Sequence, residues 1–113
     1  MKKLLAQLLG QGGNDVPSLS PTEAKILQML INHREMYGLQ LVEESDGDIK
    51  RGTVYVTLQR MAEKGFVESR QEEPQPSMPG LPRRLYRATG AGETALRTWE
   101  RVAVLLGKGL VAP

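Results

Sequence analysis

The order in which helical and strand patterns follow one another is the strongest constraint on how this chain can fold. Apolar residues recur with helical spacing over about residues 20–35, 37–45 and 51–64, which predicts three amphipathic helices in a row. In the second of these helices, Leu39, Val42 and the flanking Leu41 are expected on the buried side. The 113-residue chain therefore begins its folded part with helices that pack on one another.

The first and third helices carry recognisable end signals. Ser20 can accept a hydrogen bond as an N-cap, Pro21 suits the first turn, and Glu23 stands where it completes a capping box. Gly65 follows the third apolar stripe, and a glycine in the left-handed conformation commonly ends a helix at such a place. These signals support the helix boundaries that the apolar spacing predicts.

Two short strands and a last helix follow the three helices. Residues 66–70 and 84–88 are predicted strands, and the four prolines of residues 71–82 exclude regular structure between them. A wide apolar band predicts a helix from an N-cap at Thr89 to about Leu106. This order indicates a mainly α fold with a small β-hairpin, a winged helix-turn-helix, followed by a C-terminal helix that would serve dimerisation.

Three regions are expected from this organisation. Residues 1–18 form a tail or short helix with a flexible linker, residues 19–89 the winged helix-turn-helix, and residues 90–113 the dimerisation helix and tail. The leucines of residues 2–9 either fray or pack on a second subunit. This apolar stretch is too short for a secretory signal, and glycines end it.

Composition argues against several classes of function. The chain has no cysteine and a single histidine, His33, so a metal site, a disulfide or a catalytic triad is not expected, and no cofactor either. We find no phosphate-binding glycine loop and no paired acid and base, so the chain is not expected to be an enzyme. No apolar run is long enough to span a membrane, and the lack of cysteine suits a cytoplasmic protein.

Positive charge is concentrated in one part of the chain. The net charge is only +2, but residues 50–87 hold eight basic and four acidic residues, a sum of +4, and the remainder sums to −2. The predicted third helix and hairpin therefore carry all of the excess positive charge, as a surface that binds phosphates requires.

These basic residues, with two threonines beside them, are the candidate contacts to duplex DNA. Threonine and arginine side chains on the third helix can reach phosphates or base edges, and arginines at the hairpin can reach the backbone or the minor groove. The candidates are Lys50, Arg51, Thr53, Thr57, Arg60, Lys64, Arg83 and Arg84. The alternative is a winged helix that binds an acidic protein partner and no specific DNA sequence.

Three segments resemble the PadR family of transcriptional regulators. Residues 37–41 (YGLQL) resemble the start of that family's second helix, and residues 52–67 (GTVYVTLQRMAEKGFV) look like its recognition helix running into the wing. Residues 80–92 (GLPRRLYRATGAG) are similar to its basic wing strand and the start of its last helix. The resemblance covers about residues 19–106, and it departs from the family at Val56, where many members carry proline.

The resemblance implies a homodimeric regulator of the short-tailed type, often a repressor, that binds a double-stranded DNA operator. It implies that Tyr55 contacts a DNA phosphate, although a half-buried helix tyrosine is an equally good interpretation. Some short-tailed relatives stack flat aromatic drugs on a tryptophan between the subunits, so Trp99 is either part of an effector pocket or an interface anchor. The expected interface or pocket residues are Leu96, Trp99, Val102, Ala103 and Leu106.

Overall fold

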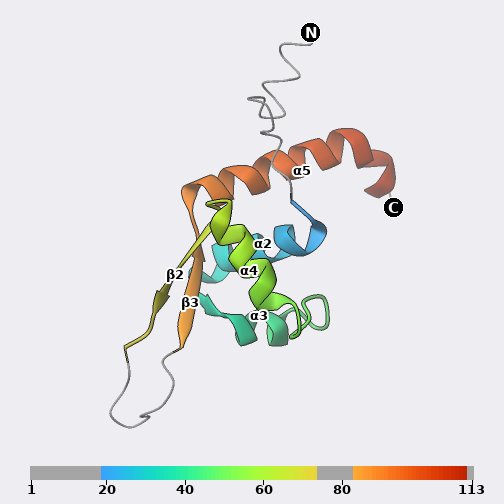
Figure 1. The fold of residues 1–113 in the computed structure, drawn as a ribbon. Coiled ribbons are helices and arrows are strands. Elements are labelled where there is room, and N and C mark those ends of the chain that lie inside the picture. Colours follow the sequence, from blue (N-terminus) through green and yellow to red (C-terminus); the bar gives the residue numbers. More distant parts are fainter. Residues whose placement is uncertain (1–18, 74–82, 112–113) are drawn as a thin grey trace.

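The computed structural model describes residues 19–73 and 83–111, with side chains described as far as residue 105. Within these residues the chain forms four helices and a small antiparallel sheet of three strands (Figure 1). The mainly α fold with a β-hairpin is therefore confirmed. The sheet has one strand more than the sequence predicted.

The helices of the body begin and end close to where their sequence signals place them. Helix α2 spans Pro21–His33, and its N-cap Ser20 and Glu23 make the predicted capping box, with the Ser20 amide donating to Glu23 Oε1 over 2.9 Å. Helix α3 spans Gly38–Glu44 and helix α4 spans Val54–Glu63. Gly65 follows α4 with φ of +82°, as expected of a glycine that ends a helix.

The sheet has the strand order β1-β3-β2. Strand β2 (Val67–Gln71) and strand β3 (Arg84–Ala88) form the predicted hairpin. Strand β1, which the sequence did not reveal, has only two residues, Met36–Tyr37, and pairs with the outer side of β3. A two-residue strand between two helices has no room for an alternating pattern. Figure 1 shows the hairpin extending from the beginning of α5 past the helical body.

The last helix, α5, spans Gly90–Val111. Its start is capped as predicted, because the Gly92 amide donates to Thr89 Oγ1 over 3.0 Å. Its end was predicted too early, since the helix continues through Gly107 and Gly109. A glycine inside a helix costs about 1 kcal/mol relative to alanine, which weakens a helix without necessarily ending it.

The core lies where α2, α4 and the sheet meet. Ile26, Leu27, Leu58 and Met61 are fully buried there. Leu41 is buried and Val42 packs against the core, as predicted, but Leu39 is a correction to the sequence prediction, since it is 40% exposed. The seven-residue α3 is too short to bury both of its sides, and its sequence does not show which of its apolar residues is left outside.

Candidate nucleic-acid interface

Helix α4 turns one face to the core and presents the opposite face to solvent. Val54, Leu58 and Met61 are buried, which confirms the predicted apolar stripe. On the opposite face Val56, with 56% of its surface exposed, and Gln59 stand out from the body, with Arg60 next to them. This face offers an apolar group, an amide and a guanidinium, which are three of the chemistries that read base edges in a major groove.

Three cations on or next to α4 are exposed. Lys50 and Arg51 lie in the turn that leads into the helix, and Arg60 lies in its last turn. None of these three side chains forms an ion pair with any residue that the structure describes. They are therefore available to neutralise phosphates.

The two threonines and Lys64 are engaged within the protein. Thr57 Oγ1 donates to the main-chain oxygen of Thr53 over 2.9 Å, so its hydroxyl is back-bonded to its own helix. Lys64, at the end of α4, holds both carboxylate oxygens of Glu23 at 3.1 and 3.2 Å. Glu23 is only 4% exposed, so this pair ties the end of α4 to the start of α2 and directs Lys64 away from the exposed face of α4.

Tyr55 is positioned by a glycine. A Cβ atom at Gly38 would lie 2.5 Å from the Tyr55 ring, so the absence of a side chain there lets the ring lie directly against the first turn of α3. Tyr55 nevertheless remains 48% exposed. Packing thus fixes the ring. Part of its surface still faces solvent, as a contact with a phosphate would require.

Consecutive arginines of the hairpin point to opposite faces of the sheet, as strand geometry dictates. Arg84 extends over the face that carries the core and donates to Ser69 Oγ over 2.9 Å. Arg83 turns to the other face, where its guanidinium lies 4.2 Å from the centre of the Tyr37 ring. The two side chains therefore extend over different faces of the sheet.

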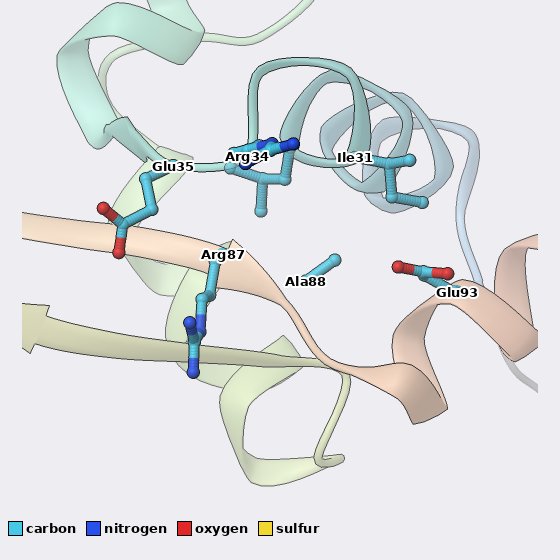
Figure 2. A pocket seen from close by; sticks show the side chains of 7 residues that line it. Ile31, Arg34, Glu35, Arg87, Ala88 and Glu93 are labelled. Atoms are coloured by element: carbon cyan, nitrogen blue, oxygen red, sulfur yellow. The ribbon is translucent and has the colours of Figure 1, made fainter.

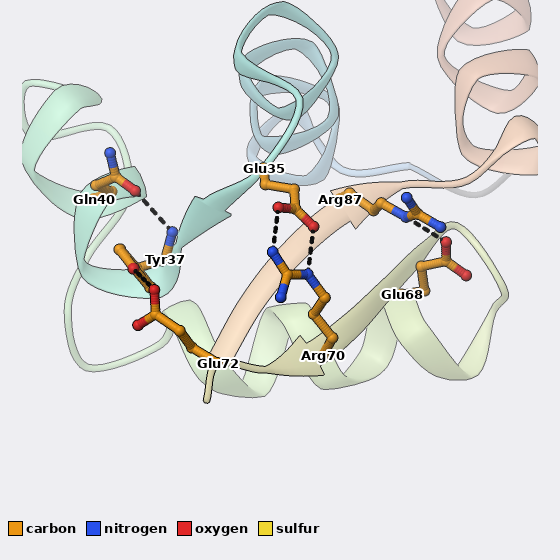
Figure 3. Close-up of polar contacts among 7 residues, drawn as sticks. All are labelled: Glu35, Tyr37, Gln40, Glu68, Arg70, Glu72 and Arg87. Carbon is orange, nitrogen blue, oxygen red and sulfur yellow. Dashed lines mark hydrogen bonds and ion pairs between the residues drawn. The ribbon is translucent and has the colours of Figure 1, made fainter. Parts of the chain in front are cut away.

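The second face of the sheet carries a ladder of ion pairs (Figure 3). Glu68 pairs with Arg87, Glu35 binds Arg70 through two hydrogen bonds of 2.9 Å, and Glu72 lies 3.6 Å from Arg83. The hydrogen bonds from Arg70 hold the pKa of the Glu35 carboxyl below its usual range. Together with Lys64, half of the eight cations of residues 50–87 are thus neutralised by a carboxylate of the same chain.

A cleft of about 560 Å³ separates the wing from the first turns of α3 and α4. It is lined by Tyr55, by Arg83, Arg84 and Tyr86 of the wing, and by Tyr37, Gly38, Leu39, Gln40 and Glu43. Burial raises the pKa of the Tyr86 hydroxyl, which therefore stays protonated and can donate a hydrogen bond. We call this space the wing cleft. It combines cations, hydroxyl donors and aromatic rings on one concave surface.

The predicted interface residues lie along α5. Leu96 is buried within its own chain, and Trp99 is partly buried against the same core. Val102 and Ala103 are half-buried, whereas Val104 and Leu105 are 62% and 65% exposed. The side chain of Leu106 lies outside the described residues, as do residues 1–18. The exposed apolar surface thus starts beyond Trp99, toward the end of the helix.

A second hollow lies between the end of α2, strand β3 and the start of α5 (Figure 2). Its volume is about 490 Å³, and Ile31, Arg34, Glu35, Arg87 and Glu93 are among the residues that line it. None of them belongs to the predicted effector residues. Within the described residues, no group of three or more acidic, histidine or cysteine side chains is placed to hold a metal.

Val56 and Gln59 are exposed residues of α4 that are not among the candidates predicted from the sequence. Positive charge marks most of those candidates, and Val56 and Gln59 are neutral. Their signal was available, since positions 56 and 59 lie across the helix from the buried stripe of Val54, Leu58 and Met61.

The three-helix body with its β-hairpin defines a winged helix-turn-helix protein. A family model described as "Transcriptional regulator PadR-like family" matches residues 26–98. The chain therefore belongs to the PadR-like family of transcriptional regulators, which bind DNA operators and are not enzymes. No curated protein sequence matches this chain.

Solved structures support the same fold. A PadR family regulator from Clostridium difficile superimposes with a TM-score of 0.68 at 23% identity, covering 80% of this chain and 95% of that one. A transcriptional regulator from Thermoplasma acidophilum is 28% identical with a TM-score of 0.64, covering 79% and 85%. A PadR family regulator from Eggerthella lenta covers 99% of this chain and 92% of its own, at 24% identity and a TM-score of 0.61.

Proposed function

We propose that this chain represses transcription as a homodimer that binds an operator with two half-sites in duplex DNA. Each subunit places α4 in a major groove, and the half-sites lie about one helical turn apart. Repression is steric, because the bound dimer covers the promoter. In this proposal residues 19–89 bind DNA, residues 90–113 hold the dimer together, and the protein acts in the cytoplasm.

The observation that carries the proposal is that, among the described residues between 50 and 87, the cations without a carboxylate partner lie around the exposed face of α4. Lys50 and Arg51 stand at one end of that face, Arg60 stands along it, and Arg84 stands on the neighbouring wing. We assign phosphate contacts to Lys50, Arg51 and Arg84. The wing cleft then receives one sugar–phosphate strand, with Tyr55 against a phosphate.

The exposed face of α4 supplies the base contacts in this proposal. Gln59 can bond adenine through its amide, Arg60 can bond guanine, and Val56 can contact a thymine methyl group. Thr53 and Thr57 support the backbone contacts beside them, and Lys64 contributes to the general positive potential only.

The dimer interface is proposed on the apolar side of α5. Trp99, Val102, Ala103 and Leu106 contact the partner subunit, and the exposed Val104 and Leu105 enlarge the contact. Leu96 supports this surface from within its own core. We assign Trp99 as an interface anchor, and quenching of its fluorescence by planar aromatic compounds would instead favour an effector pocket between the subunits.

Selection of bound fragments tests the function directly. Purified protein is mixed with sheared genomic DNA of its source, and the retained fragments are sequenced to define an operator. Binding to that duplex and to a scrambled duplex of equal composition is then measured by fluorescence anisotropy. We expect the operator to bind at least about a thousandfold more tightly than the scrambled duplex. Equal affinity for both, or a salt-insensitive complex with a protein in place of DNA binding, would refute the proposal.

A further inference from the structure

Two side-chain bonds cross the middle strand of the sheet on the face that carries the ion-pair ladder (Figure 3). Strands β1 and β2 are not neighbours, because β3 lies between them. Glu35, just before β1, nevertheless binds Arg70 of β2, and Tyr37 of β1 binds Glu72, which directly follows β2. The body of the protein is thus connected to the outer strand of the wing by side chains as well as by the sheet.

The bond between Tyr37 and Glu72 is part of a closed group of three residues. The Tyr37 hydroxyl donates to Glu72 Oε2 over 2.6 Å, Glu72 Oε1 lies 3.6 Å from Arg83 Nε, and the Arg83 guanidinium stacks on the Tyr37 ring. The Glu72 amide also donates to the main-chain oxygen of Arg83 over 2.7 Å. The hydrogen bond to Glu72 is the main reason why the pKa of Tyr37 is raised.

The body side of this group is fixed by helix α3. The Tyr37 amide donates to Gln40 Oε1 over 2.9 Å, which anchors the residue to the first turn of the helix. On the wing side, Glu72 and Arg83 are the main-chain pair just beyond the end of the hairpin strands. Strand β1 contributes only two residues to the sheet, so the Tyr37–Glu72 bond is a substantial part of what joins α3 to this end of the wing.

We propose that Tyr37 and Glu72 form a latch that sets the position of the wing relative to α4, and that they raise DNA affinity as positioning residues. This inference rests on the proposed function, since DNA must contact α4 and the wing together. The residue next to the latch is Arg84. Among the described arginines of the wing, it alone extends over the face of the sheet that carries the core, and it alone has no carboxylate partner among the described residues. A latched wing holds Arg84 at the wing cleft before DNA arrives, so less conformational entropy is lost on binding.

Two substitutions of Glu72 can separate the effect of the wing's position on DNA binding from the effect of its charge. Glu72→Gln and Glu72→Ala each remove one negative charge, but only glutamine keeps an oxygen that can accept from the Tyr37 hydroxyl. Each is made alone and together with Tyr37→Phe, and the dissociation constant for the selected operator is measured at one salt concentration. Glu68→Gln and Glu68→Ala are the matched control, because Glu68 lies on β2, the strand that Glu72 follows, and binds Arg87 instead of Tyr37.

A latch predicts a difference between the two variants at Glu72 and none at Glu68. We expect Glu72→Ala to bind the operator about three- to tenfold more weakly than Glu72→Gln. Tyr37→Phe should weaken the wild-type protein by a similar factor and remove the difference between the two Glu72 variants. Equal dissociation constants for Glu72→Gln and Glu72→Ala, or no effect of Tyr37→Phe, would overturn the proposal.

Hydrogen exchange of the free protein tests the latch without DNA. Tyr37→Phe should accelerate exchange of the Glu72 amide and leave the amide of Ala24, in the capped α2, unchanged. Unchanged exchange at Glu72 rejects the latch even if DNA binding is affected. Failure of the wild-type protein to bind any duplex, with faster Glu72 exchange in the variant, would reject the proposed function and retain the latch.

Discussion

Replacing Gly92 with alanine should destabilise the protein, although alanine is the better helix former. Gly92 lies in the first turn of α5 and is buried against the segment that follows α4. A Cβ atom at this position would lie 2.1 Å from the main-chain oxygen of Phe66 and 3.0 Å from a methyl group of Leu27. A main-chain oxygen cannot rotate away as a side chain can, so the helix itself must move.

The expected loss of stability follows from the contacts that a movement of α5 disturbs. Overpacking of this kind costs about 1–3 kcal/mol. Moving α5 also strains the hydrogen bond of 3.0 Å from the Thr89 amide to the oxygen of Phe66, which is worth about 1 kcal/mol. The higher helix propensity of alanine returns about 1 kcal/mol. We therefore expect a net loss of about 1–3 kcal/mol in the free energy of unfolding.

Gly90 provides the matched control in the same helix turn. A Cβ atom there meets no other atom within 4 Å, so Gly90→Ala should be neutral or slightly stabilising. Both variants and the wild-type protein are unfolded in urea at equal protein concentration, because the proposed dimerisation would make the apparent stability depend on protein concentration. The sign of the difference in unfolding free energy between Gly92→Ala and Gly90→Ala decides the outcome. If Gly92→Ala is as stable as Gly90→Ala, helix propensity outweighs the contact with Phe66 and the packing argument is wrong.

Three further outcomes are expected from single contacts. The double variant Arg60→Ala/Arg84→Ala should bind DNA at least about tenfold more weakly at fixed salt. Its melting temperature should be unchanged, because both residues are exposed. The control variant Arg97→Ala, on α5, should bind DNA like the wild type. Trp99→Ala should shift the protein toward monomer in sedimentation velocity, and an undiminished dimer would remove Trp99 from the interface. In an NMR titration the pKa of the Glu35 carboxyl should lie below the usual range of a glutamate and rise in Arg70→Leu, and identical values in both proteins would contradict the bidentate pair.

Local signals in the sequence were sufficient for most of the fold. The capping box at Ser20, the glycine after α4 and the strand at residues 84–88 each depend on neighbours in the chain, and each is confirmed. Strand β1 depends instead on a partner fifty residues away, since Met36 pairs with Tyr86. A contact of that kind leaves no trace in a window of a few residues.

The candidate site was harder to predict, because charge counts do not show which charges are already paired. Arg70 and Arg87 look like Arg60 in the sequence, yet a glutamate distant along the chain holds each of them. Part of the arrangement was accessible, because adjacent strand residues point to opposite faces, which predicts Arg83 and Arg84 on different faces of the sheet. The long-range partners of Arg70 and Lys64 required the fold itself.

The difference between the number of cations in the sequence and the number left without a carboxylate partner affects how DNA affinity depends on salt, which can be measured. Each cation that neutralises a phosphate releases counterions, and the logarithm of the binding constant falls with the logarithm of salt concentration by about 0.9 per phosphate. The sequence count of eight cations in residues 50–87 would give a slope of about −14 for a dimer. The four cations that lack a carboxylate partner among the described residues are Lys50, Arg51, Arg60 and Arg84.

Of these, Lys50, Arg51 and Arg84 are assigned to phosphates and Arg60 to guanine, so three phosphate contacts in each subunit of the proposed dimer predict a slope of about −5. Anisotropy titrations of one operator between about 50 and 200 mM salt measure this slope. A paired arginine that leaves its glutamate to bind a phosphate gains little free energy, because it exchanges one anionic partner for another. The paired arginines should therefore keep their glutamates when DNA binds. A slope close to −14 would show that the ion-pair ladder opens on DNA and that the wing binds with all of its arginines.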